Sequence, residues 1–272
     1  MFDSPTRWRL VMEYDGADFV GWQVQPEGRS VQGVLEEALE GLFVEPIRAY
    51  ASGRTDAGVH AVEQVVGFDA QVDRSPREVR DGLNALLPED VAVVCAEVAE
   101  PGFDPRRWVV AKRYRYTWLD RASRSPLRRN RAWHVRGSLD AEAMDAAARL
   151  LGGRHDFSSF RAAGCGAAHP VRLVKDIAVV RRDDEVHLDV VGHGFLRHMV
   201  RIIAGTLLEV GQGRHPSGWV GEVLAARDRS AAGRTAPPHG LTLVSVSYGT
   251  GPPAYGDGSP EVTPAGTAGA GS

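Results

Sequence analysis

The sequence has little of what marks several classes of protein. It contains two cysteines in 272 residues, Cys95 and Cys165, which form neither a disulfide framework nor a metal-ligand spacing. It has no run of about 18 apolar residues, the length that a membrane-spanning helix requires. Its N-terminus lacks the basic and apolar segments of a secretory signal. These absences favour a cytoplasmic protein with no membrane segment, no disulfide and no metal site.

Charge is present in both signs but is unevenly distributed. The net charge is −3, yet the segment from Pro105 to Arg136 holds eleven Lys/Arg and a single acid, Asp120. Cations bind phosphates and flat rings stack on unpaired bases, so a basic segment with interleaved aromatics predicts RNA binding. A basic but merely solvated loop is the alternative. The interleaved rings are those of Trp108, Tyr114, Tyr116, Trp118, Trp133 and His134.

Hydrophobic periodicity predicts that the first hundred residues follow the order β-α-β-β-α-β, which is typical of a ferredoxin-like or RRM-like unit. Ser30 is expected to cap the first helix, and a capping box at Ser75 to open the second. The expected elements are strand 7–15, helix Val31–Val44, strands Ile47–Ala51 and Val62–Asp69, a helix ending near Leu87, and strand Val91–Val98.

The second half repeats this theme less regularly. We expect strand Val109–Leu119, a helix that follows Asp140 and ends at the Gly152-Gly153 pair, a hairpin of Val171–Arg182 and Glu185–Val191, helices Phe195–Val210 and Ser217–Arg227, and strand Leu241–Tyr248. The fold class is therefore α+β. Residues 1–104 and 105–248 form two RRM-like halves that share one continuous, mainly antiparallel sheet, with helices on one side and a central basic cleft. Residues 249–272, rich in Gly, Pro, Ala, Ser and Thr, are expected to be a disordered tail.

The segment Ser52–Ala61, S-G-R-T-D-A-G-V-H-A, is the strongest candidate for chemistry. Gly53 and Gly58 can adopt positive φ and allow close approach of another group. Arg54 and Asp56 are two residues apart in an extended loop, so the guanidinium can hold the carboxylate ionised and oriented. An ordinary turn with a structural Arg–Asp pair is the alternative.

Two pairs of residues near the start of the helix predicted from Phe195 are considered as further site residues. His193 and His198 are five residues apart, a spacing that does not place both on one face of a helix, so we predict no zinc site. Arg197 and Arg201 are four apart in a predicted helix and should face the same way, as candidate phosphate contacts. Ordinary surface charge explains these two arginines equally well.

Four motifs in order resemble those of the TruA family of tRNA pseudouridine synthases. The Gly53–Ala61 loop is similar to its catalytic loop, and Y-D-G-A-D-F-V-G-W-Q at 14–23 to its N-terminal signature. K-R-Y-R-Y at 112–116 is similar to its tyrosine strand, and F-L-R-H-M-V-R-I-I-A-G-T-L at 195–207 to its C-terminal helix. The resemblance covers the chain from about residue 7 to residue 248.

This resemblance implies a homodimeric isomerase, without cofactor, that converts uridines 38, 39 and 40 in the anticodon stem-loop of tRNA into pseudouridine. It implies Asp56 as the catalytic nucleophile or base, Arg54 as its cation and Tyr114 as the ring that stacks on the base and carries a proton. Leu241 matches the position of an apolar residue against the base. The other expected substrate contacts are Lys112, Arg128, Arg129, Arg197 and Arg201.

Two other functions fit parts of the sequence. A non-catalytic RNA-binding protein made of paired RRM-like units would explain the basic segment, although no RNP1-like run is present. A nucleosidase with a single carboxylate would explain Asp56 but not the basic segment.

Overall fold

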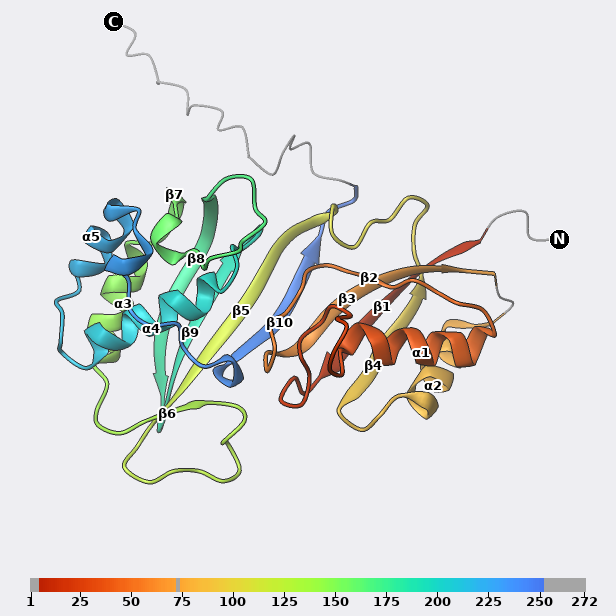
Figure 1. Cartoon of the computed structure of the whole chain (residues 1–272), viewed down its shortest axis with the longest axis horizontal. Coiled ribbons are helices and arrows are strands. Elements are labelled where there is room, and N and C mark those ends of the chain that lie inside the picture. Colours follow the sequence, from red (N-terminus) through yellow and green to blue (C-terminus); the bar gives the residue numbers. More distant parts are fainter. Residues whose placement is uncertain (1–4, 72–73, 252–272) are drawn as a thin grey trace, which may run out of the picture.

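A computed structural model of the chain describes residues 5–71 and 74–251. From residue 252 on, the predicted disordered tail lies outside the described residues. Within those ranges the chain forms one ten-stranded sheet and five α-helices (Figure 1). The strands are β1 (Thr6–Tyr14), β2 (Tyr50–Ala51), β3 (His60–Ala70), β4 (Val91–Val98), β5 (Val109–Asp120), β6 (Trp133–Val135), β7 (Gly153–Asp156), β8 (Val171–Arg182), β9 (Glu185–Gly192) and β10 (Leu241–Tyr248). The helices are α1 (Val31–Phe43), α2 (Pro76–Leu86), α3 (Ala141–Arg149), α4 (Met199–Gly211) and α5 (Trp219–Ala226).

The sheet is continuous across both halves, as predicted. Its strand order is β4-β1-β3-β10-β5-β9-β8-β7, with β2 added beside β3 and β6 beside β5. All pairs are antiparallel except β10 with β3 and β6 with β5. The last strand, β10, therefore lies between the two halves and joins them. A division of the chain at residue 104 stays a prediction, because the sheet passes through it without interruption.

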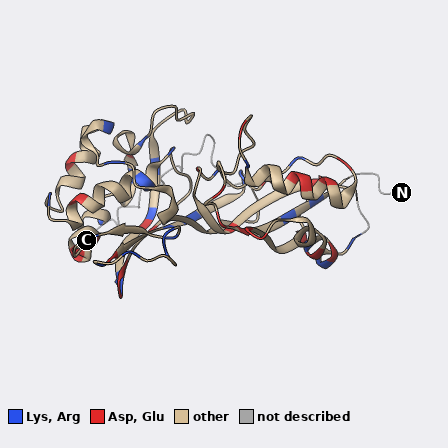
Figure 2. Ribbon diagram, turned by 60° about the horizontal axis from the view of Figure 1, so that its bottom comes forward, with Lys and Arg blue, Asp and Glu red and all other residues tan. Residues whose placement is uncertain are grey.

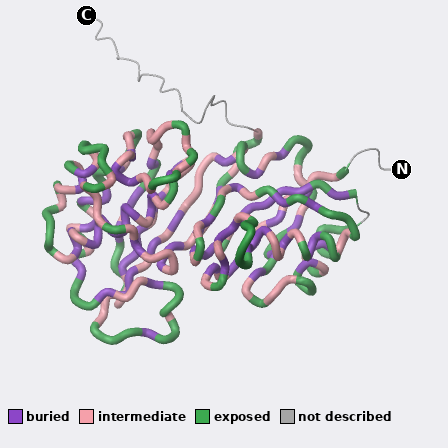
Figure 3. The backbone as a smooth tube through the Cα atoms, viewed as in Figure 1, coloured by how far each residue is buried: buried purple, intermediate pink, exposed green. Residues whose placement is uncertain are grey.

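One face of the sheet is buried along its whole length. Alternate residues of β1, β5 and β9 point to this face, where the core residues include Leu10, Met12, Tyr116, Trp118 and Leu188. The helices pack there in two groups, α1 with α2 and α3 with α4 and α5 (Figures 1 and 2). Figure 3 shows the buried strand positions in contrast to the exposed connecting loops, among them the long loop between β5 and β6. This confirms the α+β class and the helices on one side.

Local signals in the sequence determined several boundaries correctly. The Oγ of Ser30 accepts a hydrogen bond from the N–H of Gly33. Ser75 and Glu78 form the predicted capping box, and Asp140 caps α3. In each case the side chain satisfies a backbone group that the first helical turn leaves unpaired.

Three predictions about elements were wrong. The strand expected at Ile47–Ala51 is reduced to Tyr50–Ala51, and β6 and β7 were missed because each is too short to show a periodicity. Helix α4 begins at Met199 and not at Phe195, because His198 adopts the left-handed conformation with φ of 59°. Residues 195–198 are therefore a loop, which changes where Arg197 points.

Candidate active site

Asp56 lies in the loop between β2 and β3, and the segment 14–23 holds this loop from the side. Gly21 and Asp56 form an isolated β-bridge. The N–H of Trp22 donates to the carbonyl of Thr55 at 3.1 Å, and the N–H of Gly58 donates to the carbonyl of Phe19 at 3.2 Å. Two of the motifs singled out in the sequence therefore form one unit.

The carboxylate of Asp56 is bound through one of its oxygens. Its Oδ2 accepts from Nη1 of Arg201 at 3.1 Å and lies 3.5 Å from Nε2 of His198. The Oδ1 atom has no partner among the residues that the structure describes. With 32% of its side chain exposed, Asp56 is accessible to a substrate. One oxygen is thus fixed by the Arg201 guanidinium, with the His198 ring nearby, and the other is open.

The ion pair expected between Arg54 and Asp56 is not formed. Arg54 is exposed. In the described part of the chain the cation that contacts Asp56 is Arg201, and the His198 ring, whose pKa is lowered by burial, lies near the same oxygen. Two residues of separation in a loop allowed a pair but did not require it, because the backbone of Thr55 and Asp56 is bound to Trp22 and Gly21. The two glycines also differ: Gly58 has a φ of 75°, whereas Gly53 is not in the positive-φ region.

Arg201 occupies a different place from the one expected. It leaves α4 toward Asp56, its Nε donates to the carbonyl of Ala236 at 2.9 Å, and only 13% of its side chain is exposed. Arg197 precedes the helix, is exposed, and donates to the carbonyl of Ala163 at 3.1 Å. The two arginines therefore do not form one helical face. Arg201 binds the carboxylate, and Arg197 remains available at the surface beside it.

Tyr114 lies on β5 in the middle of the buried sheet face, and 8% of the residue is exposed. Its ring contacts that of Phe195 edge to face, with 5.2 Å between centroids. Burial raises its pKa, and the nearby Tyr14 and Asp56 raise it further, so the phenol is neutral and its hydroxyl can donate. Leu241, 6% exposed, pairs with Tyr116 at the start of β10.

The sequence analysis missed the groups that hold the loop residues on the N-terminal side of Asp56. The Tyr14 hydroxyl and Thr55 Oγ1 are 2.8 Å apart, and burial raises the pKa of Tyr14 to about 12. Gln64 is fully buried, and its Nε2 donates to the carbonyl of Gly53 at 2.9 Å. Gln64 lies on the core face of β3. A polar residue at a core position could have been noticed in the sequence, because buried polar groups require hydrogen-bond partners.

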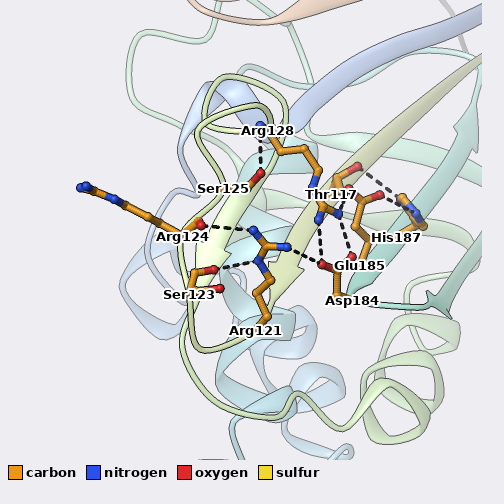
Figure 4. A network of polar contacts seen from close by, with 9 residues as sticks. All are labelled: Thr117, Arg121, Ser123, Arg124, Ser125, Arg128, Asp184, Glu185 and His187. Atoms are coloured by element: carbon orange, nitrogen blue, oxygen red, sulfur yellow. Dashed lines mark hydrogen bonds and ion pairs between the residues drawn. The ribbon is translucent and has the colours of Figure 1, made fainter.

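The basic segment 105–136 is largely paired with acids from elsewhere. Of its eleven cations, six contact a carboxylate: Arg107, Arg113, Arg115, Arg121, Arg128 and Arg131. Figure 4 shows how Arg121 and Arg128 bind Asp184 and Glu185 at the turn of the β8–β9 hairpin. Arg128 contacts both oxygens of Asp184, each at 2.7 Å, and these bonds raise its pKa. Acids from other segments therefore neutralise part of this charge, and the basic surface is smaller than the excess of cations in the sequence suggests.

The three cations of this segment that we expected to contact substrate differ in position. Arg128 holds the β5–β6 loop to the hairpin. Arg129 is exposed and donates to the carbonyl of Pro126 at 2.9 Å. Lys112 is turned inward, where its Nζ donates to the carbonyl of Ser52 at 2.6 Å. Only Arg129 keeps the position of a surface contact.

Comparison with known proteins identifies the family. The sequence profile described as "tRNA pseudouridine synthase" matches residues 10–104 and 147–249. The chain belongs to the tRNA pseudouridine synthase family. It is 55% identical over 250 residues to "tRNA pseudouridine synthase A" of Myxococcus xanthus, covering 91% of this chain and 94% of that protein. It is also similar to the proteins of the same name from Geotalea uraniireducens (48% over 240 residues, 88% and 98% covered) and Geobacter sulfurreducens (49% over 240 residues, 88% and 98% covered).

Members of the tRNA pseudouridine synthase family are isomerases, and the site geometry is consistent with the resemblance drawn from the four motifs. Three of those motifs meet at Asp56: segment 14–23 bridges it, β5 places Tyr114 near it, and α4 supplies Arg201. In the described ranges no three His, Cys, Asp or Glu side chains are grouped as a metal site, and no helix there is long and apolar enough to cross a membrane.

Proposed function

We propose that the protein isomerises uridines 38, 39 and 40 in the anticodon stem-loop of tRNA to pseudouridine, with Asp56 as the catalytic nucleophile or base. The observation that supports this most is the asymmetry of the Asp56 carboxylate. Oδ2 is held by Arg201 and His198, while Oδ1 is open on the loop. A single carboxylate suits this reaction, whereas glycoside hydrolysis normally requires two.

The chemistry is an internal exchange of bonds. The bond between N1 of uracil and C1′ of ribose breaks, the base turns, and a bond between C5 and C1′ forms. The hydrogen on C5 leaves as a proton and N1 gains one, so no atom or electron has to be supplied. Asp56 attacks the nucleoside or takes the C5 proton, and Arg201 orients the carboxylate for either step.

Tyr114 and Leu241 are proposed to contact the base. The tyrosine ring offers a flat surface for the extruded uracil, and its neutral hydroxyl can pass a proton. Leu241 offers an apolar surface on the neighbouring strand, two residues before Leu243, which pairs with Tyr114. The low exposure of Tyr114 and Leu241 would limit the access of water to the broken glycosidic bond.

The tRNA would bind mainly through cations that the fold leaves at the surface. Arg54 lies two residues before Asp56, Arg197 immediately precedes His198, and Arg129 lies on the β5–β6 loop, all three exposed. Two such subunits, one binding the reacting stem-loop and the other gripping the rest of the tRNA, would form the cytoplasmic homodimer that the resemblance implies.

The test uses tRNA labelled with tritium at C5 of uridine, incubated with the protein and no cofactor. We expect tritium release into water without release of free uracil, and pseudouridine at positions 38 to 40 when the product is mapped. A nucleosidase would release uracil and leave an abasic site. Tight tRNA binding with no tritium release would show a binding protein and would contradict the proposal.

A further inference from the structure

We propose that Lys112 is a positioning residue whose inward-turned ammonium group fixes the catalytic loop over β5, and that it does not contact tRNA. The inference rests on the proposed function only where turnover is measured. Its structural part concerns the two peptide groups that precede Arg54, and these can be examined without substrate.

Two successive carbonyls of the loop are held by side chains of neighbouring strands, the half-buried Lys112 and the buried Gln64. The Nζ of Lys112 donates to the carbonyl of Ser52 at 2.6 Å, and the Nε2 of Gln64 donates to that of Gly53 at 2.9 Å. Ser52 is itself fully buried, and its Oγ donates to Oε1 of Gln64 at 2.7 Å. The segment entering Arg54–Asp56 is therefore fixed at both peptide oxygens, although it belongs to no strand.

Lys112 has no carboxylate partner among the described residues. An ammonium that loses part of its hydration without gaining a counter-ion lowers stability, and natural proteins keep such groups mainly where they have a function. Burial, with a smaller contribution from the charge of Arg106, lowers the pKa of Lys112 to about 8. The ionisable groups that act on it or feel its charge are Arg106 on the preceding loop and His193 after β9. Neither of these can pair with the ammonium as an anion near neutral pH.

The position of Lys112 on β5 explains how it can influence catalysis. It lies two residues before Tyr114 on the same face of the strand. One strand thus carries both the proposed base-stacking ring and the group that fixes the loop of Asp56. The contact with Ser52 therefore sets the distance between the two catalytic side chains, and a shift of about 1 Å at such a site can cost about a hundredfold in rate.

Gly53 is required by this arrangement. A Cβ at position 53 would collide with the Nζ of Lys112. Its backbone is not in the positive-φ region, so the glycine is needed for space and not for conformation. An alanine at this position can adopt the backbone but must displace the ammonium.

The chain offers a matched control, because its only other lysine is Lys175. Lys175 is exposed and donates to a backbone carbonyl, that of Val110 at 3.0 Å. We expect Lys112→Met to lower kcat at least tenfold in the tritium-release assay, with KM for tRNA unchanged and a thermal midpoint close to that of wild type. Lys175→Met should leave kcat and KM unchanged.

Hydrogen exchange at residues 52–56 provides a readout that needs no substrate. We expect faster exchange there in Lys112→Met and in Gly53→Ala, and no change in Lys175→Met. Unchanged exchange in both loop variants, or a raised KM with wild-type kcat in Lys112→Met, would overturn the proposal. If Lys112→Met does not fold, Gly53→Ala decides by the same two measurements. Failure of the proposed function would appear instead as a wild-type protein that releases no tritium while the loop still responds in exchange.

Discussion

Two Arg–Asp contacts in this molecule look alike as pairs but differ in how the carboxylate is used. Asp184, at the β8–β9 turn, receives Arg128 on both oxygens at 2.7 Å and Arg121 at 3.1 Å. Asp56, in the loop before β3, receives Arg201 on one oxygen at 3.1 Å, with His198 3.5 Å from the same atom. Both oxygens of Asp184 thus accept hydrogen bonds, whereas only one oxygen of Asp56 does.

We expect this difference to separate a structural pair, at Asp184, from the pair that orients the proposed catalytic carboxylate of Asp56. A bidentate pair satisfies the acceptor and fixes its geometry, so nothing remains for a substrate. A carboxylate held through one oxygen keeps an oriented lone pair on the other. Proximity of opposite charges does not distinguish these cases, whereas the number of occupied oxygens does.

The largest expected effect comes from exchanging each acid for its amide. Asp56→Asn should lower the rate of tritium release by at least about a thousandfold, since an amide can act neither as nucleophile nor as base. It should leave tRNA affinity and the unfolding midpoint near those of wild type. The matched Asp184→Asn should retain the rate and unfold at a lower temperature. Activity of Asp56→Asn within about tenfold of wild type would remove Asp56 from catalysis.

The next effect tests the two arginines. Arg201→Gln should lower kcat about a hundredfold, because the carboxylate loses the charged donor that orients it. Arg128→Gln should leave kcat within about twofold and loosen the β5–β6 loop. Single-turnover kinetics with saturating enzyme measure both. Equal losses of rate in the two variants would show that the two pairs play the same role.

A smaller effect is expected for RNA affinity. Arg129→Ala should reduce the slope of log affinity against log salt by about 0.7 to 0.9, the value of one lost phosphate contact. Arg128→Ala should leave the slope unchanged, because its guanidinium is engaged by Asp184 and Glu185. Filter binding of one tRNA over a range of salt concentrations measures the slope. A reduced slope in Arg128→Ala alone would place the tRNA on the hairpin turn.

The smallest effect concerns acid stability. The hydrogen bonds from Arg128, followed by the charges of Arg128 and Arg121, lower the pKa of Asp184 from 3.8 to about 2. A pKa lowered by folding means that this contribution is fully present above about pH 4 and is lost as the pH falls toward 2. Urea unfolding of wild type and Asp184→Asn should therefore differ at pH 6 and converge near pH 2. A difference that persists at pH 2 would mean that packing, and not charge, holds the turn.

The β-α-β-β-α-β order of the first half, the caps at Ser30 and Ser75, the bounds of β4 and β10 and the alternation of β5 were all predicted from the sequence. These features depend on neighbouring residues, so periodicity and side-chain hydrogen bonds within a few positions determine them. Asp56 and Tyr114 were singled out from motifs in the same way, and both lie at the junction of the two halves.

The partners of these residues were decided only by the tertiary structure. Arg201 reaches Asp56 across 145 positions of sequence, Lys112 reaches Ser52 across 60, and Arg128 reaches Asp184 across 56. The sequence favoured the near neighbour, Arg54, as the partner of Asp56, and predicted a basic stripe. In the structure six of the eleven cations contact a carboxylate, and for five of them that acid is distant in the sequence. The spacing of residues in the sequence limits which neighbouring side chains can meet. A charged side chain can also pair with a distant residue when the sheet and helices bring the two within a few ångströms. The strand order that brings them together depends on the whole chain.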